Sequence, residues 1–196
     1  MRYSFFALIS RMRNITRWAL MRNSATENVQ EHSHMTAVLA HALAVIRRDV
    51  LGHDADPGYV AAAALYHDSS EIFTGDMPTP IKYFDPDIMS AYKRVESVAS
   101  RKLLCALPPE MRPAYEPLLS PAGGEEGMAL VRAADKLAAY IKCIEELKTG
   151  NLEFRLAAEQ SREKLDSLNM PEVEYFIKHF VPAFELTLDE LDFSFD

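Results

Sequence analysis

Residues 58–71 read Gly58-Tyr59-Val60-Ala61-Ala62-Ala63-Ala64-Leu65-Tyr66-His67-Asp68-Ser69-Ser70-Glu71. This stretch predicts a core helix from Gly58 to about Glu71, because its alanines allow close packing against neighbouring helices. Val60, Ala63 and Ala64 precede His67 by seven, four and three residues, so the imidazole is expected to project from the packed face. Asp68 follows directly, and a buried carboxylate is costly unless a cation compensates its charge.

The flanking sequence predicts further helices. A helix from about Glu27 to Val50 is expected, with Ser24 or Thr26 as its N-cap. Its core face is predicted from apolar residues at helical spacing, namely Met35, Val38, Leu39, Ala42, Leu43 and Ile46. Other helices are expected over residues 4–13, 87–107, 125–148, 151–168 and 171–184, with a long loop over 73–86. Without strand alternation or a fixed repeat, the sequence predicts an all-α protein, an irregular bundle of about eight helices.

The composition excludes several classes of protein. Hydrophobic residues make up 48% of the 196 residues and charged residues 26%, which predicts a folded domain with a buried core. The net charge of -8, without a basic stretch, argues against binding long nucleic acid. No apolar run reaches the ~18 residues of a membrane span. The two cysteines have no CxxC spacing, and the first residues lack a signal-peptide cleavage site, so we expect a cytoplasmic protein.

Three expected helices each direct a polar residue into the core. His32 lies near the start of the helix before Gly58, His67 and Asp68 end the next, and Asp135 shares a helical face with Val131 and Ala138. Taken singly, the His-Asp pair is consistent with a capping or core role, and the other aspartate with an arginine partner or a cap. One shared cation explains all of them more economically. Two imidazoles and two carboxylates suit a transition metal such as Mn, Co, Fe or Zn better than Ca or Mg.

The pattern His32…His67-Asp68…Asp135 resembles that of the HD-domain metal-dependent phosphohydrolases. The chain further resembles the bacterial HD-domain 5'-deoxynucleotidases over nearly its whole length. The segments that carry this resemblance are Arg17-Trp18, Thr26 to Ser33, Tyr66 to Glu71, Thr74-Gly75-Asp76-Met77-Pro78-Thr79-Pro80, Ala134-Asp135-Lys136 and the late segments Glu145-Glu146-Leu147 and Tyr175-Phe176. It implies a single HD-type domain over residues 1–196, with a metal-binding core at about 27–150.

The resemblance implies a metal-dependent phosphomonoesterase that converts deoxyribonucleoside 5'-monophosphates to deoxyribonucleosides and phosphate. His32, His67, Asp68 and Asp135 would bind one divalent metal (Co, Mn, Fe, Cu or Zn), with Co or Mn favoured. Glu71 lies four residues after His67, near the same face if the helix continues, and is the expected general acid or base. The alternative is that Glu71 is a surface carboxylate at a helix end, without a catalytic role.

The remaining implied roles concern the substrate. Arg17 would clamp the phosphate with its planar fork, unless it is an ordinary surface arginine. Trp18 would pack against the sugar and crowd a 2'-hydroxyl, or else be a core anchor. Asp76 and Thr79, with Met77 and Pro78 in the same loop, would bind the 3'-hydroxyl and neighbouring groups, and Asp68 and Asp135 would also touch the substrate. As in the family, an apolar helix face would form a homodimer.

Two rival functions stay open. One is another HD phosphohydrolase, acting on a cyclic nucleotide, a guanosine alarmone or a nucleoside triphosphate; the Arg17-Trp18 pair and the Asp76 loop argue against it. The other is an inactive HD protein that binds a nucleotide and regulates a partner. It is disfavoured because all four expected metal ligands and Glu71 are present.

Overall fold

The computed structural model describes residues 2–78, 81, 84–119 and 125–191. This part of the chain contains helices and one isolated bridge between Thr16 and Asn28, but no strand. The all-α prediction is therefore confirmed. The α-helices are α1 (Phe5–Ile9), α2 (Val29–Val45), α3 (Pro57–Tyr66), α4 (Glu71–Thr74), α6 (Pro86–Cys105), α7 (Arg112–Leu119), α8 (Glu125–Lys148), α9 (Arg155–Asp166) and α10 (Pro171–His179).

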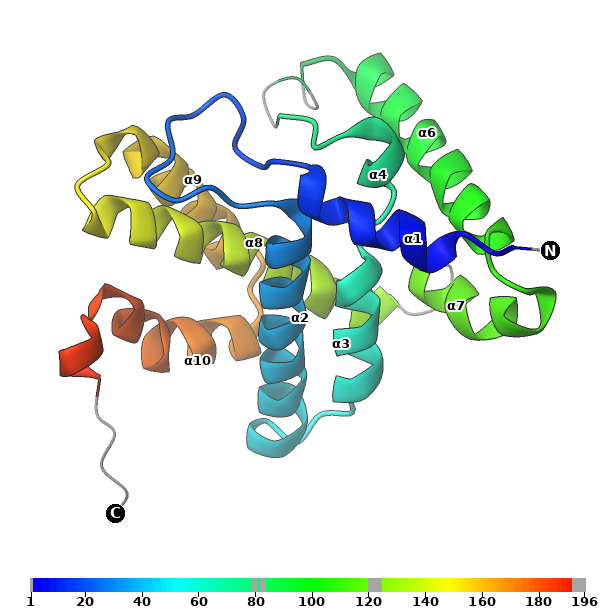
Figure 1. Ribbon diagram of the computed structural model, residues 1–196. Helices are drawn as coiled ribbons and strands as arrows, with labels where there is room; N and C mark the ends of the chain where they lie inside the picture. Colours follow the sequence, from blue (N-terminus) through cyan, green and yellow to red (C-terminus); the bar gives the residue numbers. More distant parts are fainter. Residues whose placement is uncertain (1, 79–80, 82–83, 120–124, 192–196) are drawn as a thin grey trace.

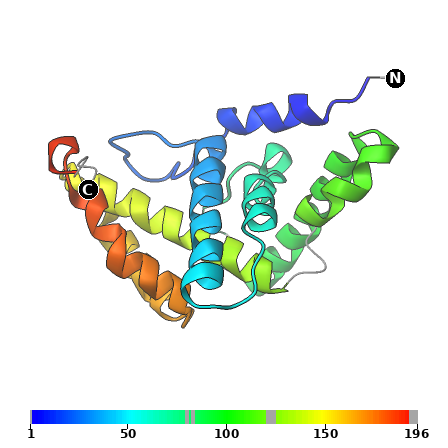
Figure 2. The ribbon, with the colours of Figure 1, turned by 90° about the horizontal axis from the view of Figure 1, so that it is seen from below.

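Helix α2 lies at the centre of the molecule, beside α3, and α8 crosses both (Figure 1). Helices α9 and α10 lie on one side of this centre and α6 and α7 on the other, as the rotated view also shows (Figure 2). The largest core cluster joins side chains of α2, α3, α8 and α10. A smaller cluster, centred on Phe5, Leu103, Leu107 and Leu119, joins α1 to α6 and α7. No helix among the described residues is long and apolar enough to span a bilayer.

Helix α2 begins later than expected, and its buried face matches the predicted one only in part. Its N-cap is Asn28, which accepts hydrogen bonds from the backbone N–H groups of Gln30 and Glu31, so the predicted caps Ser24 and Thr26 were wrong. Of the predicted core face, Leu39, Leu43 and Ile46 are buried and Ala42 packs against the core. The prediction was wrong for Met35 and Val38, which are 36% and 51% exposed. The buried side also includes His32, as expected, and the polar residues Ser33 and Thr36, which apolar spacing does not reveal. A π-helical turn, Ile46–Val50, ends the segment.

Helix α3 ends before the residue that was expected to end it. Asp56 caps its start through the Tyr59 N–H, and the helix stops at Tyr66 instead of running to Glu71. From His67 onward, backbone N–H groups bond to carbonyls three residues back, as Ser69 does to Tyr66 and Glu71 to Asp68 (both 3.0 Å). This tighter turn joins α3 to α4 and changes the direction of the side chains that follow Ala64.

The remaining helices agree closely with expectation, apart from short tight turns at their ends. Helix α8 has the predicted bounds, whereas the 151–168 segment starts as a 3-10 turn (Leu152–Phe154) and the last segment ends as one (Val181–Glu185). Other 3-10 turns are Ser10–Asn14, Pro109–Met111 and Leu188–Glu190. At Gly127 an added Cβ would lie 3.4 Å from the Tyr59 ring, so this glycine lets α8 pack closely on α3.

Candidate active site

Three core elements bring two histidines and two aspartates together. His32 comes from α2, His67 and Asp68 from the turn after α3, and Asp135 from the middle of α8. His32 Nε2 lies 3.1 Å from Asp135 Oδ1 and 3.5 Å from Asp68 Oδ2. His67 Nε2 lies 3.1 Å from Asp68 Oδ2 and 3.9 Å from Asp135 Oδ1. Ligand atoms of His32, His67 and Asp135 all lie within 4.8 Å of one another, which is close enough to share one ion.

The donor set fits a divalent transition metal. His67 Nδ1 lies 2.7 Å from the Ala64 carbonyl oxygen, so Nδ1–H donates there and leaves the lone pair of Nε2 directed into the cluster. Nε2 is buried and lies 3.1 Å from Asp68 Oδ2, an oxygen that would share the same ion. His32 is fully buried, whereas the Asp135 side chain is 40% exposed, so the cluster has a closed side and an open side. An open side is what substrate and water need to reach a catalytic metal.

The electrostatics of the cluster also favour a cation. Burial by itself would lower the pKa of His67, but the Asp68 carboxylate, with help from Asp135, raises it to about 9. Burial would raise the pKa of Asp68, yet the two imidazoles and Arg17 hold it well below its usual range. The pKa of Asp135 is also lowered, because its hydrogen bond to His32 outweighs burial. Both carboxylates are therefore ionised and stabilised by positive charge.

Glu71 is a buried carboxyl group beside the cluster. It is the first residue of α4, 7% exposed, and its Oε2 has no hydrogen-bond partner among the described residues. Burial, reinforced by the negative charges of Asp68 and Asp76, raises its pKa to about 9. The surface alternative is therefore wrong. The expected geometry was also wrong, because a tight turn and not a continuous helix connects His67 to Glu71.

Arg17 reaches the cluster from the loop between α1 and α2. Its side chain is 12% exposed and its Nη1 lies 3.5 Å from Asp68 Oδ2, so it is not an ordinary surface arginine. Trp18 follows with φ of 57°, a left-handed backbone that is rare for a bulky residue. Its ring packs against Phe154, with the ring centroids 5.3 Å apart and the planes tilted by 57°, a contact that fits the alternative of a core anchor.

The loop after α4 contributes the next expected residues. Gly75 has φ of 71°, which only glycine adopts readily, and the chain turns there towards Asp76. Asp76 is close enough to raise the pKa of both Arg17 and Glu71. Met77 and Pro78 follow and are half-buried. Thr79 lies outside the described residues, so its predicted contact stays a prediction.

Comparison with known proteins agrees with this geometry. A family model described as 5'-deoxynucleotidase YfbR-like matches residues 4–184. The chain belongs to this family. It is 48% identical over 188 residues to the 5'-deoxynucleotidase VP0926 of Vibrio parahaemolyticus, which covers 95% of this chain and 97% of that protein. The 5'-deoxynucleotidase YfbR of Salmonella arizonae is 47% identical over 95% of this chain and 94% of its own length.

Solved structures show the same fold. An HD-domain phosphohydrolase of Listeria innocua superimposes with a TM-score of 0.78 at 24% identity, covering 92% of this chain and 88% of that one. The HD phosphohydrolase DatZ of cyanophage S-2L, solved with dA and one catalytic Zn²⁺ ion, gives a TM-score of 0.61 at 19% identity. It covers 93% of this chain and 99% of that protein. The predicted HD-type architecture is confirmed for this YfbR-like chain.

Two acidic residues that carry much of this architecture were missed from the sequence. Glu27 accepts hydrogen bonds from both Arg17 and Trp18, and Glu146 of α8 holds the backbone of Ser24 and Ala25. Both lie in segments that carry the family resemblance, but neither was given a role, and nothing in the spacing of Glu27 points to its partners. Glu146 is separated from its loop partners by more than a hundred residues, so no local pattern reveals the pairing.

Proposed function

We propose that this protein hydrolyses deoxyribonucleoside 5'-monophosphates to deoxyribonucleosides and phosphate. The observation that carries the proposal is the convergence of two imidazoles and two carboxylates from three core elements, with Arg17 and the buried Glu71 at the edge of the cluster. Membership of the YfbR-like 5'-deoxynucleotidase family supports this substrate class.

His32, His67, Asp68 and Asp135 would hold one divalent metal. Ligand atoms of His32, His67 and Asp135 lie within 4.8 Å of one another, and Asp68 Oδ2 lies 3.1 Å from His67 Nε2. The Zn²⁺ in the cyanophage protein supports a single ion. When bound, such a metal supplies Lewis-acid polarisation of the phosphate and lowers the pKa of water. Imidazole and carboxylate ligands together accept cobalt, manganese, iron, copper and zinc. Among these ions we favour cobalt or manganese.

Arg17 would bind the phosphate and hold it for in-line attack by water. Its guanidinium already faces the Asp68 carboxylate at 3.5 Å, and such a fork can hold two phosphate oxygens once a substrate is present. Asp68 and Asp135 lie on the same rim, where they also contact the substrate. The Arg17 guanidinium would then lie beside the phosphate oxygens on which negative charge develops as the P–O bond breaks.

Glu71 would act as the general acid. Its raised pKa, about 9, keeps the carboxyl group protonated near neutral pH in the metal-free protein. The proton passes to the 5'-oxygen as the bond from that oxygen to phosphorus breaks, so the nucleoside leaves as a neutral alcohol. Its hydrogen-bond-free Oε2 is available for this contact.

Trp18 and the loop after Gly75 would select the sugar. The indole, fixed on Phe154, crowds a 2'-hydroxyl, and Asp76 with Thr79, beside Met77 and Pro78, binds the 3'-hydroxyl. Little in these residues reads a base, so the enzyme is expected to accept several bases. A homodimeric state, a cytoplasmic location and the treatment of residues 1–196 as one domain stay predictions.

The deciding experiment is phosphate release from deoxyribo- and ribonucleoside 5'-monophosphates after chelation and re-addition of each metal. We expect no release in chelator, restoration by Co or Mn, and faster turnover of the deoxyribonucleotides. Rapid turnover of triphosphates or cyclic nucleotides, with none of monophosphates, would move the protein to another HD phosphohydrolase class. Metal binding without any turnover would favour the inactive regulator.

A further inference from the structure

One carboxylate oxygen connects Arg17 and Trp18, which are neighbours in the loop before α2. Glu27 Oε2 accepts from Arg17 Nε at 3.2 Å and from Trp18 Nε1 at 3.1 Å. The side chain of Glu27 is 17% exposed and that of Arg17 12%, so both bonds are largely shielded from water. Hydrogen bonds to a charged group are stronger and more directional when they are shielded in this way.

The backbone adds a second connection between the same residues. The Arg17 N–H donates to the Glu27 carbonyl at 2.9 Å, next to the bridge between Thr16 and Asn28. Trp18 then adopts its left-handed backbone, which is unfavourable for a bulky residue and persists only when its surroundings fix it. The Glu27 side chain holds the indole on one side while Phe154 packs against the ring.

Glu27 also determines which nitrogen of the Arg17 guanidinium points towards the metal-ligand cluster. The guanidinium is surrounded by the negative charges of Asp68, Asp135, Glu27 and Asp76, which together raise its pKa despite burial. Without Glu27, the side chain would be drawn towards the aspartates alone. With Nε held by Glu27, the Nη1 end is directed towards Asp68 Oδ2, on the edge of the metal-ligand cluster.

We propose that Glu27 is the positioning residue that couples phosphate binding to sugar selection. It fixes Arg17 and Trp18 through a single oxygen, so that both side chains take their places together. The inference rests on the proposed function, since it assigns Arg17 to the phosphate and Trp18 to the sugar. It adds that the two specificities depend on one carboxylate that touches neither part of the substrate.

The test is steady-state kinetics with dAMP and AMP for Glu27→Ala and Glu27→Gln, with Glu159→Ala on α9 as an exposed control. We expect Glu27→Ala to raise KM for dAMP about tenfold and to lower the ratio of kcat/KM for dAMP over AMP, at unchanged metal content. Glu27→Gln keeps one acceptor oxygen but loses the charge, so both effects should be smaller. The control should match the wild type.

Double variants identify the coupling. In a Trp18→Ala background, Glu27→Ala should not lower the ratio of kcat/KM for dAMP over AMP any further. In an Arg17→Ala background, it should not raise KM for dAMP any further. Fully additive effects in both pairs, or an unchanged KM and ratio in Glu27→Ala, would overturn the proposal. If Glu27→Ala does not fold, Glu27→Gln is carried through the same pairs. An unchanged ratio in Trp18→Ala alone would refute the sugar role of Trp18, while the pairing with Arg17 would still test Glu27.

Discussion

Replacing Glu146 should cost more stability than any surface substitution on the same helix. Glu146 is 1% exposed, and its two oxygens accept from five groups on four residues. The Lys142 ammonium and the Ala25 N–H (3.3 Å) bond to Oε1. The Ser24 N–H (2.8 Å), the Ser24 hydroxyl (2.6 Å) and the Asn151 amide (2.8 Å) bond to Oε2. These bonds attach the loop before α2 to α8.

The magnitude follows from what remains after the carboxylate is removed. In Glu146→Ala the Lys142 ammonium, itself 8% exposed, keeps only the Ala25 carbonyl as acceptor. Leaving a buried charge without its partner costs about 3–5 kcal/mol. Glu146→Gln should cost less, about 1–3 kcal/mol, because the amide oxygen still accepts but its NH₂ group must face another donor. With an m value of about 2 kcal/mol/M, Glu146→Ala lowers the urea midpoint by roughly 1.5–2.5 M.

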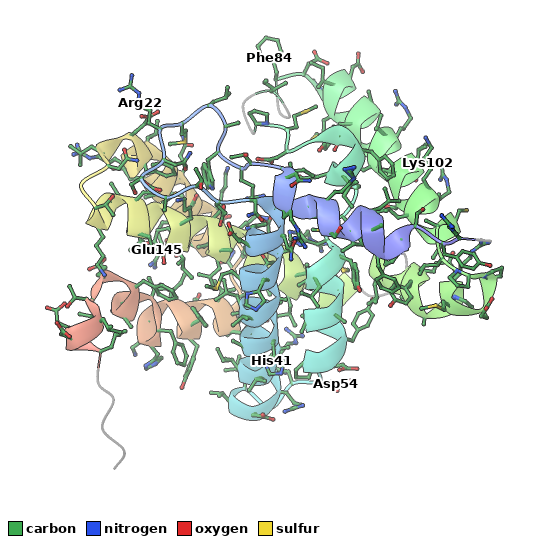
Figure 3. The ribbon with its side chains drawn as sticks, in the orientation of Figure 1. Arg22, His41, Asp54, Phe84, Lys102 and Glu145 are labelled. Atoms are coloured by element: carbon green, nitrogen blue, oxygen red, sulfur yellow. The ribbon has the colours of Figure 1, made fainter. Side chains whose placement is uncertain are left out.

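The assay is urea unfolding of the metal-free protein followed by circular dichroism. Glu145→Ala is the matched control, because Glu145, labelled in Figure 3, is the preceding residue of α8 and is exposed. Its free energy of unfolding should stay within about 0.5 kcal/mol of the wild-type value. The double variant Glu146→Met with Lys142→Met should recover part of the loss, since no unpaired charge remains. A Glu146→Ala midpoint equal to that of Glu145→Ala would refute the reasoning.

Three further predictions concern the site. His67→Ala and Asp135→Asn should each lose bound metal and activity, and metal analysis that finds a full ion in either would remove that residue as a ligand. Trp18→Ala should relax the preference for deoxyribose, and an unaltered ratio of dAMP to AMP hydrolysis would reject that role. In chelator, Glu71 has a pKa raised by burial to about 9, so its contribution to stability is complete below its ordinary value of 4.5 and is lost as pH rises towards 9. The free energy of unfolding of Glu71→Gln, relative to that of the wild type, should therefore rise between about pH 5 and about pH 8.5, by at most about 1.4 kcal/mol per pH unit. A difference from the wild type that is the same at about pH 5 and at about pH 8.5, as expected for Glu159→Gln, would contradict the raised pKa.

Much of the fold could be predicted because helical periodicity and chain punctuation are local signals. The bounds of α8 were predicted correctly because a long periodic segment ends at a glycine turn. The errors occurred where a polar group replaced the expected apolar one. On α2 the polar residues Ser33 and Thr36 are buried, whereas Met35 and Val38, which were expected in the core, are exposed. The N-cap moved to Asn28 because its capping box with Glu31 satisfies more N–H groups than a lone hydroxyl can.

The site was predictable to a different extent for each residue. His67, Asp68 and Asp135 stood out because imidazoles and carboxylates on apolar faces need an explanation from chemistry, and the structure brings them together. Glu71 was selected on an assumption of helical continuity that the tight turn after α3 contradicts. Glu27 could not be given a role, because a glutamate in a polar segment has no periodicity, and its value depends on where two neighbouring side chains point.

The close packing of the core and the geometry of the site depend on the same small residues. Four alanines are buried almost completely, Ala63 and Ala64 on α3 and Ala133 and Ala134 on α8. The first two shortly precede the metal-ligand candidate His67, and the other two shortly precede Asp135. Small side chains let the helix axes approach, and that approach brings imidazole and carboxylate atoms within a few ångströms of one another. A larger residue at Ala134 would therefore act on the ligand distances as well as on packing. Metal affinity is expected to be as sensitive to this buried alanine as stability is, although its side chain carries no ligand atom.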